Sequence, residues 1–195
     1  GRAGGEGGDG DAGLPAAGIP MSGKEAERRH HVLYVIDQLQ KPFGGAERVL
    51  LKMLENLPST YRGTVLTFKT NLTTEEIARM GAPLIVFPMT SAYDLNAAKM
   101  ALRLRKLVRQ ESVEIVHTFF ESSDLWAGTI AKLVCRVAVV SSRRDMGILR
   151  GRKHKVLYRA LSNVPDKVIA VSEQVKQFVI ATDRTPAKKV VTIYN

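Results

Sequence analysis

Val32-Leu-Tyr-Val-Ile36 decides the fold, because five apolar residues in succession are typical of a strand that is buried on both faces. A polar loop begins at Asp37 and leads into an amphipathic helix predicted at 46–57, whose apolar side chains recur at helical spacing. A buried strand that runs into a helix is the first part of a parallel β-α-β crossover. The sequence therefore predicts parallel strands connected by helices.

The rest of the chain repeats this alternation of short apolar runs and longer segments with helical periodicity. Parallel connections need a crossover of about a dozen residues, and the spacing provides it. We expect an α/β fold, a Rossmann-like, doubly wound and mostly parallel sheet of about seven strands. The predicted strands are 32–36, 63–68, 83–87, 114–117, 138–142, 167–171 and 190–194, and the predicted helices are 46–57, 74–80, 95–110, 124–133, 155–161 and 173–182.

The composition separates a tail from a domain. The chain has 195 residues, of which 45% are hydrophobic and 25% charged, enough for one globular domain. Residues 1–30 are dominated by Gly, Ala and charged side chains and cannot bury enough apolar surface to order themselves. We expect 1–30 to be a disordered tail, with Met21 as an alternative start, and 31–195 to be the domain.

The charge balance points to an anionic partner. Lys and Arg number 29 against 19 Asp and Glu, a formal net charge of +10, which suits phosphates, nucleic acid or anionic lipid. The single cysteine, Cys135, excludes an internal disulfide and a Cys-based metal site, and we expect no metal or cofactor. Because no apolar run approaches the roughly 20 residues of a membrane span, the expected location is the cytoplasm or the inner face of the cytoplasmic membrane.

Ligands of open α/β sheets bind at the carboxyl ends of the strands, so the residues that follow each strand are the candidates. Gly44 and Gly45 open the first helix, where backbone N–H groups are free to meet a phosphate; a flexible turn is the alternative. The spacing is neither G-x-G-x-x-G nor a P-loop, which weakens a nicotinamide or ATP interpretation.

Three further positions follow strands. His117 closes the fourth predicted strand, where it can move a proton or bind a sugar hydroxyl, or serve structure alone. Ser172 follows the sixth strand and is explained by capping the last helix, although its hydroxyl also faces the same edge. The run Ser141-Ser-Arg-Arg-Asp145 places Arg143, Arg144 and Asp145 after the fifth strand.

The arginine run continues into a basic segment. Guanidinium groups bind phosphates and carboxylates, so we expect Arg143 and Arg144 to line the crevice, with a solvated face as the alternative. The segment after them favours a lipid or acceptor surface over nucleic acid, because Tyr158 is nearly its only aromatic residue. Its basic residues are Arg150, Arg152, Lys153, Lys155 and Arg159.

Four motifs together resemble glycosyltransferase family 4, in the order in which that family has them. They are Gly44-Gly-Ala-Glu47, Ile115-Val-His-Thr118, Asp166-Lys-Val-Ile-Ala-Val-Ser-Glu173 and Val191-Thr-Ile-Tyr-Asn195. The resemblance covers 31–195 and implies one half of a GT-B architecture, in which two Rossmann-like domains face each other across a cleft. It implies retaining transfer of a sugar from a nucleotide sugar, without a metal, to a glycan or lipid-linked acceptor such as a lipopolysaccharide core.

The resemblance also assigns residues. Gly44 and Gly45 match family glycines near the donor phosphates or acceptor. His117 matches the first histidine of a His-x-His pattern, and Phe119 stands here in place of the second histidine. The half that holds the nucleotide sugar would follow Asn195, so this chain alone is expected to be inactive. Two alternatives stay open: a nucleotide-sugar epimerase of the same architecture, and a non-enzymatic module that binds anionic membranes through its basic surface.

Overall fold

The sheet of the computed structural model contains seven strands, and every neighbouring pair is parallel. The structure describes residues 29–89, 95–144 and 152–194, and of 152–155 the backbone only. Across the sheet the strands follow the order β3-β2-β1-β4-β5-β6-β7. They are β1 (His30–Leu39), β2 (Tyr61–Thr70), β3 (Leu84–Val86), β4 (Ile115–Phe119), β5 (Ala138–Arg143), β6 (Lys167–Ala170) and β7 (Val190–Thr192).

Helices occupy the connections between the strands. The short helix α4 (Glu121–Ser123) continues into the π-helical turns η1 (Asp124–Gly128) and η2 (Ala131–Cys135), and we call this continuous segment the 121–135 helix. The other helices are α1 (Gly45–Glu55), α2 (Thr74–Arg79), α3 (Leu95–Gln110), α5 (Arg152–Ala160), α6 (Glu173–Thr182) and the 3-10 turn η3 (Ala187–Lys189).

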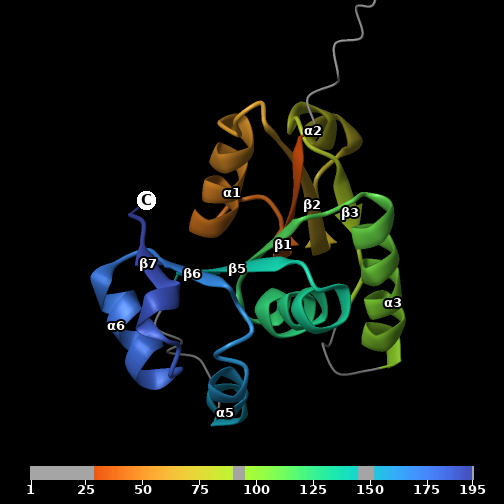
Figure 1. Cartoon of the computed structure of the whole chain (residues 1–195). Coiled ribbons are helices and arrows are strands. Elements are labelled where there is room, and N and C mark those ends of the chain that lie inside the picture. Colours follow the sequence, from red (N-terminus) through yellow and green to blue (C-terminus); the bar gives the residue numbers. More distant parts are fainter. Residues whose placement is uncertain (1–28, 90–94, 145–151, 195) are drawn as a thin grey trace, which may run out of the picture.

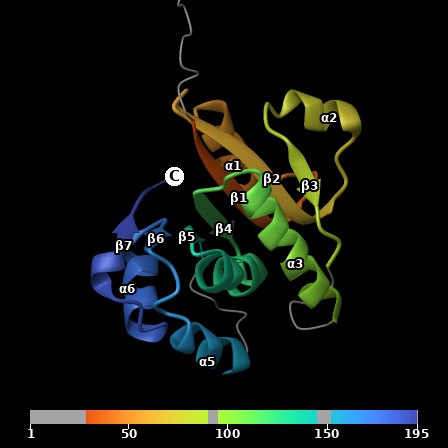
Figure 2. The same ribbon diagram turned by 45° about the vertical axis from the view of Figure 1, so that its right-hand side comes forward.

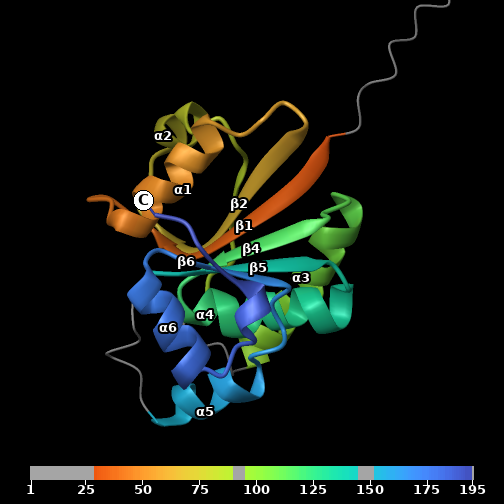
Figure 3. The same ribbon diagram turned by 60° about the vertical axis from the view of Figure 1, so that its left-hand side comes forward.

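The helices form layers on both faces of the sheet (Figures 1 and 3). On one face, α1 packs on side chains of β1 and β2 such as Tyr34 and Val65, together with Leu72 and Met80, which flank α2. On the other face, α3 and the 121–135 helix enclose Leu33, Val116 and Trp126. A third apolar cluster joins α6 to β6 and β7. Each of the central strands is therefore covered by apolar side chains, as a parallel sheet requires.

The structure confirms the predicted fold and moves several boundaries. All seven predicted strands and all six predicted helices are present. β1 runs on to Leu39, because its last residues pair with β2, so the loop before α1 is shorter than expected. The helix predicted at 124–133 spans 121–135. β4 continues through Phe119, so the prediction that His117 closes the fourth strand is wrong, and His117 lies within it.

Parts of the predictions fall outside the described residues. The tail expected at 1–30 lies outside the described residues, except for Arg29 and His30. Asp145 and Arg150 also lie outside them. Of the basic segment that follows, Arg159 on α5 has a described side chain, which is exposed and donates from Nε to the carbonyl oxygen of Thr182. Within the described ranges, no helix is long and apolar enough to cross a membrane.

Candidate functional site

The direction of chain travel across the sheet reverses between β1 and β4. From β1 the chain moves outward through α1 to β2, whereas from β4 it moves the opposite way through the 121–135 helix to β5. The loops after these two neighbouring strands therefore lead in opposite directions, and we call the place between them at the carboxyl edge the crevice. Ligands of open α/β sheets bind at such a switch point. The candidate site is the α1 side of this crevice.

The start of α1 forms one wall of the site. Gly44 is the N-cap, and it offers no side chain to the first N–H groups of the helix. The carboxylate of Glu47, which is buried, curls back so that a Cβ at Gly44 would lie 2.8 Å from Oε2. Gly45 has nothing within 4 Å of the same position. Gly44 thus makes room for Glu47, whereas Gly45 faces open space.

His117 lies on the same face of the sheet as α1. It pairs in register with Tyr34 of β1, and its ring stacks on Phe119 with centroids 4.7 Å apart. Its Nε2 is 2.8 Å from the hydroxyl oxygen of Ser142 on β5. Burial, with a smaller contribution from the charge of Arg144, lowers the pKa of His117 to about 4. The imidazole is therefore neutral at physiological pH.

Arg144 brings a cation to the site. It follows β5 and is partly buried, and burial lowers the pKa of its guanidinium while the charge of Glu47 opposes that shift. The charge of Arg144 also lowers the pKa of His117, so Arg144 acts electrostatically on both α1 and β4. Of the residues predicted from sequence, the structure thus brings together Gly44, Gly45, His117 and Arg144.

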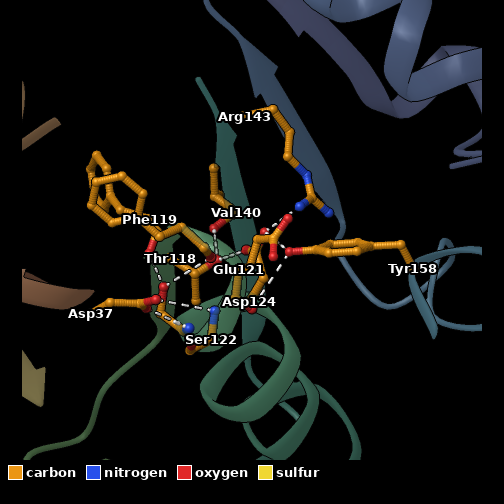
Figure 4. Close-up of polar contacts among 11 residues, drawn as sticks. Asp37, Thr118, Phe119, Glu121, Ser122, Asp124, Val140, Arg143 and Tyr158 are labelled. Atoms are coloured by element: carbon orange, nitrogen blue, oxygen red, sulfur yellow. Dashed lines mark hydrogen bonds and ion pairs between the residues drawn. The ribbon is translucent and has the colours of Figure 1, made fainter. Parts of the chain in front are cut away.

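Arg143 lies on the opposite face of the sheet. Successive residues of a strand alternate in direction, and the side chain of Arg143 points toward the 121–135 helix (Figure 4). Its Nη1 is 2.7 Å from Oδ2 of Asp124, and its guanidinium lies over the ring of Tyr158, 4.0 Å from the centroid. Burial disfavours the charge, but Asp124 and Tyr158 outweigh it and raise the pKa of Arg143. Arg143 joins β5 to the neighbouring helices.

Asp37 occupies the start of the 121–135 helix at the switch point. Its carboxylate accepts hydrogen bonds from the backbone N–H groups of Ser122 at 3.2 Å and Ser123 at 2.7 Å (Figure 4). Burial raises the pKa of Asp37, and these hydrogen bonds oppose the shift. Phe120, which comes directly before this helix, has φ 70° and ψ 173°, a backbone conformation that is strained for any residue except glycine. A carboxylate therefore already satisfies this helix terminus.

The remaining predicted residue stands apart. Ser172 caps α6 by accepting a hydrogen bond from the Val175 N–H at 3.2 Å, and it follows β6, two strands along from β4. Sequence reasoning missed Glu47, Asp37 and Asp124 as individual residues. A glutamate three positions after a helix N-cap is a known signal for a side chain that turns back, and it could have marked Glu47.

These residues favour binding of a phosphorylated ligand. The first N–H groups of α1 and the guanidinium of Arg144 attract negative charge, and Gly45 lets a ligand approach the backbone. The neutral imidazole of His117 and the Ser142 hydroxyl contact each other on the face of the sheet that α1 covers. Within the described ranges, no three His, Cys, Asp or Glu side chains are placed to hold a metal ion.

Solved structures share this fold. A glycosyltransferase from Rickettsia africae ESF-5 matches with a TM-score of 0.65 and 16% identity over 86% of this chain and 43% of that protein. Anabaena Alr3699/HepE, solved with UDP and glucose, matches with a TM-score of 0.63 and 19% identity over 84% of this chain and 44% of that protein. The lipopolysaccharide outer core galactosyltransferase WaaB matches with a TM-score of 0.64 and 16% identity over 85% of this chain and 45% of that protein. UDP-N-acetylglucosamine 2-epimerases have the fold too.

The chain thus spans less than half the length of the solved structures that it matches. No curated protein sequence matches it. The family model Glycosyltransferase Family 4 matches residues 43–195, which is more than half of the chain and includes the start of α1, β4 and the end of β5. With its parallel sheet and its switch-point crevice, the chain belongs to glycosyltransferase family 4.

Proposed function

We propose that the chain is the N-terminal, acceptor-side half of a retaining glycosyltransferase that moves a sugar from a nucleotide-sugar donor to a glycan or lipid-linked acceptor. The observation that carries this proposal is that Arg144, which follows β5, acts electrostatically on both Glu47 at the start of α1 and His117 on β4, at the switch point of a family 4 domain. A related fold solved with UDP and glucose supports a nucleotide-sugar donor.

The charges of the site suit the bond that breaks. In sugar transfer the bond between the anomeric carbon and the donor diphosphate breaks, a bond to the acceptor oxygen forms, and negative charge grows on the leaving diphosphate. The N-terminus of α1 and the guanidinium of Arg144 stabilise such charge. We assign His117 a positioning role, because its buried ring holds Ser142 and packs on Phe119 behind the crevice.

The proposal includes a second half of the protein. In the solved structures that share the fold, this chain covers less than half of the length. We therefore propose that donor binding is completed outside these residues and that this chain alone does not turn over. We further propose an anionic acceptor, such as a lipid-linked pyrophosphate sugar or a lipopolysaccharide core, because it would complement Arg144 and the net charge of +10.

The test is sugar transfer by the full-length protein with UDP-glucose, UDP-galactose and other nucleotide sugars, measured as release of nucleoside diphosphate. Arg144→Gln should lower kcat/KM by about a hundredfold, the usual size of losing one electrostatic contact to a developing charge. The matched control is Lys188→Gln, which removes one exposed cation before β7, at the opposite edge of the sheet. Equal activity of Arg144→Gln and the control would overturn the role of Arg144.

The same assay separates the other candidate functions. Release of free nucleotide and of an epimerised free sugar without any acceptor would identify a nucleotide-sugar epimerase. Absence of turnover with every nucleotide sugar and acceptor extract, in a full-length protein that is folded, would favour the non-enzymatic module. Transfer of radiolabelled sugar into a lipid extract or glycan supports the glycosyltransferase.

A further inference from the structure

Helix α3 (Leu95–Gln110) has two faces of different character. Ala97, Met100, Leu104 and Val108 are buried against the sheet. On the opposite side, Leu95, Lys99, Leu102, Lys106 and Arg109 follow one another at intervals of four and three residues, which places them in one stripe along the helix. All five are exposed. The helix therefore presents to solvent a row in which leucine and cationic side chains alternate.

A second element extends this row. The 121–135 helix packs beside α3 (Figure 2), and its last turn exposes Leu133. The thiol of Cys135, two residues further on, feels the charges of Arg105 and Arg109, so this turn lies beside the C-terminal half of α3. The exposed fractions of Leu95, Leu102 and Leu133 are 92%, 68% and 63%. Exposed leucines thus occur along one stripe of α3 and on the turn beside its C-terminal half, which is more apolar exposure than single scattered side chains give.

The charge of the region has one sign. The sequence of α3 contains five Lys and Arg residues and no Asp or Glu, and residues 129–137 add two cations and no acid. Cations that alternate with leucines are typical of segments that lie on a bilayer, where ammonium groups reach the phosphates and leucines enter the acyl boundary. Single-stranded nucleic acid would need exposed aromatic rings for base stacking, and neither 95–110 nor 129–137 contains an aromatic residue.

We propose that this surface, formed by Leu95, Lys99, Leu102, Lys106, Arg109 and Leu133 and here called the basic-apolar face, docks the protein on an anionic lipid bilayer. It lies on a different helix from the basic segment that sequence reasoning favoured for this role. The inference names the membrane partner of the proposed enzyme, and it uses none of the transfer chemistry.

The topology brings the start of α3 to the edge of the sheet at which the site lies. α3 follows the carboxyl end of β3, so Leu95 lies at the same edge of the sheet as the switch point, and the helix runs from there toward the opposite edge. Because α3 and α1 cover opposite faces of the sheet, a bilayer against the basic-apolar face would lie on the side away from α1. A lipid-linked acceptor would then reach the switch point around the carboxyl edge, which both faces share.

The experiment is co-sedimentation of the protein with vesicles of phosphatidylcholine alone and of phosphatidylcholine with about 30% phosphatidylglycerol, which supplies the negative surface charge. The protein should bind the anionic vesicles and release them as salt is raised. Lys99→Gln/Lys106→Gln should lower the partition coefficient about thirtyfold, because each interfacial lysine contributes about fivefold. The matched control, Lys69→Gln/Lys188→Gln, removes two exposed lysines outside the face and should bind like the unaltered protein.

A second variant tests the apolar half of the proposal. Leu102→Ser keeps every charge and should lower partitioning about tenfold, because a leucine no longer leaves water. Circular dichroism melting checks that each variant is folded. Equal binding by the lysine variant and its control, or binding by Leu102→Ser at the unaltered level, would overturn the proposal. So would binding to a single-stranded oligonucleotide but not to vesicles. Because vesicle binding needs no donor sugar, its failure leaves the proposed enzyme activity untouched.

Discussion

Arg143 and Arg144 are consecutive in the chain, but they serve different parts of the molecule. The alternation of side chains along β5 sends Arg143 to Asp124 and Tyr158, whereas Arg144, the next residue, acts electrostatically on Glu47 and His117. The sequence correctly placed both at a strand end, and it could not separate them because the strand boundary fixes which face each one takes. Glu47 could not be identified from the sequence for a similar reason, since sequence alone does not show which carboxylates are buried.

His117 should make the stability of the protein depend on pH. The pKa of its imidazole is about 4 in the folded protein and about 6.5 in the unfolded chain, so the unfolded chain binds more protons between these values. As far as His117 determines it, the free energy of unfolding should therefore stay at its highest value above pH 6.5. It should fall by about 3 kcal/mol as the pH drops to 4. Urea unfolding at pH 7, 6, 5 and 4.5 measures this.

The comparison variant is His117→Gln, which keeps a hydrogen-bonding group near Ser142 and removes the titration. Its stability should fall less steeply over the same pH range, whatever its stability at pH 7. Identical slopes for the two proteins would show that His117 is accessible to protons in the folded state.

At the scale of elements, sequence periodicity predicted every helix and the first residues of α2, α3 and α6, but not the start of the 121–135 helix. The helix predicted at 124–133 begins at Glu121, where the N–H groups of Ser122 and Ser123 meet Asp37, a residue more than 80 positions earlier. The sequence pattern around residue 121 cannot reveal a capping residue that lies so far away in the chain. The strained Phe120 stands where a glycine would be expected, and it offered no turn signal. By contrast, Ser172 caps α6 from its own sequence neighbourhood, and that prediction is confirmed.

The buried ion pair should hold β5 to the 121–135 helix. Asp124→Asn would leave the guanidinium of Arg143 buried without its countercharge, and we expect the free energy of unfolding to fall by about 3 kcal/mol. The matched control is Lys132→Met, which breaks the more exposed pair with Asp166 and should cost about 1 kcal/mol or less. Chemical denaturation of both variants gives the comparison. Equal losses would show that the buried pair contributes no more than a surface one.

At the scale of the whole molecule, the short apolar runs predicted all seven strands because a parallel sheet buries both faces of its strands. Periodicity does not give the order of the strands across the sheet. That order, with β1 beside β4, brings α1, His117 and Arg144 to one crevice from segments about a hundred residues apart in sequence. The candidate residues could be named from sequence, but their meeting point could not.

The two glycines offer the most direct test of the central claim, that the start of α1 receives the ligand. Gly44 is a poor probe, since any side chain there displaces the Glu47 carboxylate and so changes a second group of the site. Gly45 is the first helical residue and faces open space, so Gly45→Ala should keep or slightly raise stability, by about 0.5 kcal/mol. Thr74→Ala, at the first position of α2, is the matched control outside the site.

The decisive measurement is kcat/KM for sugar transfer by the full-length protein carrying Gly45→Ala, beside the Thr74→Ala control and a thermal melt of each. If the donor diphosphate or the acceptor approaches the backbone at Gly45, the added methyl group should lower kcat/KM at least about tenfold in a fully folded protein, with the control unchanged. Unaltered turnover by Gly45→Ala would show that the start of α1 does not meet the ligand, and it would contradict the proposed site.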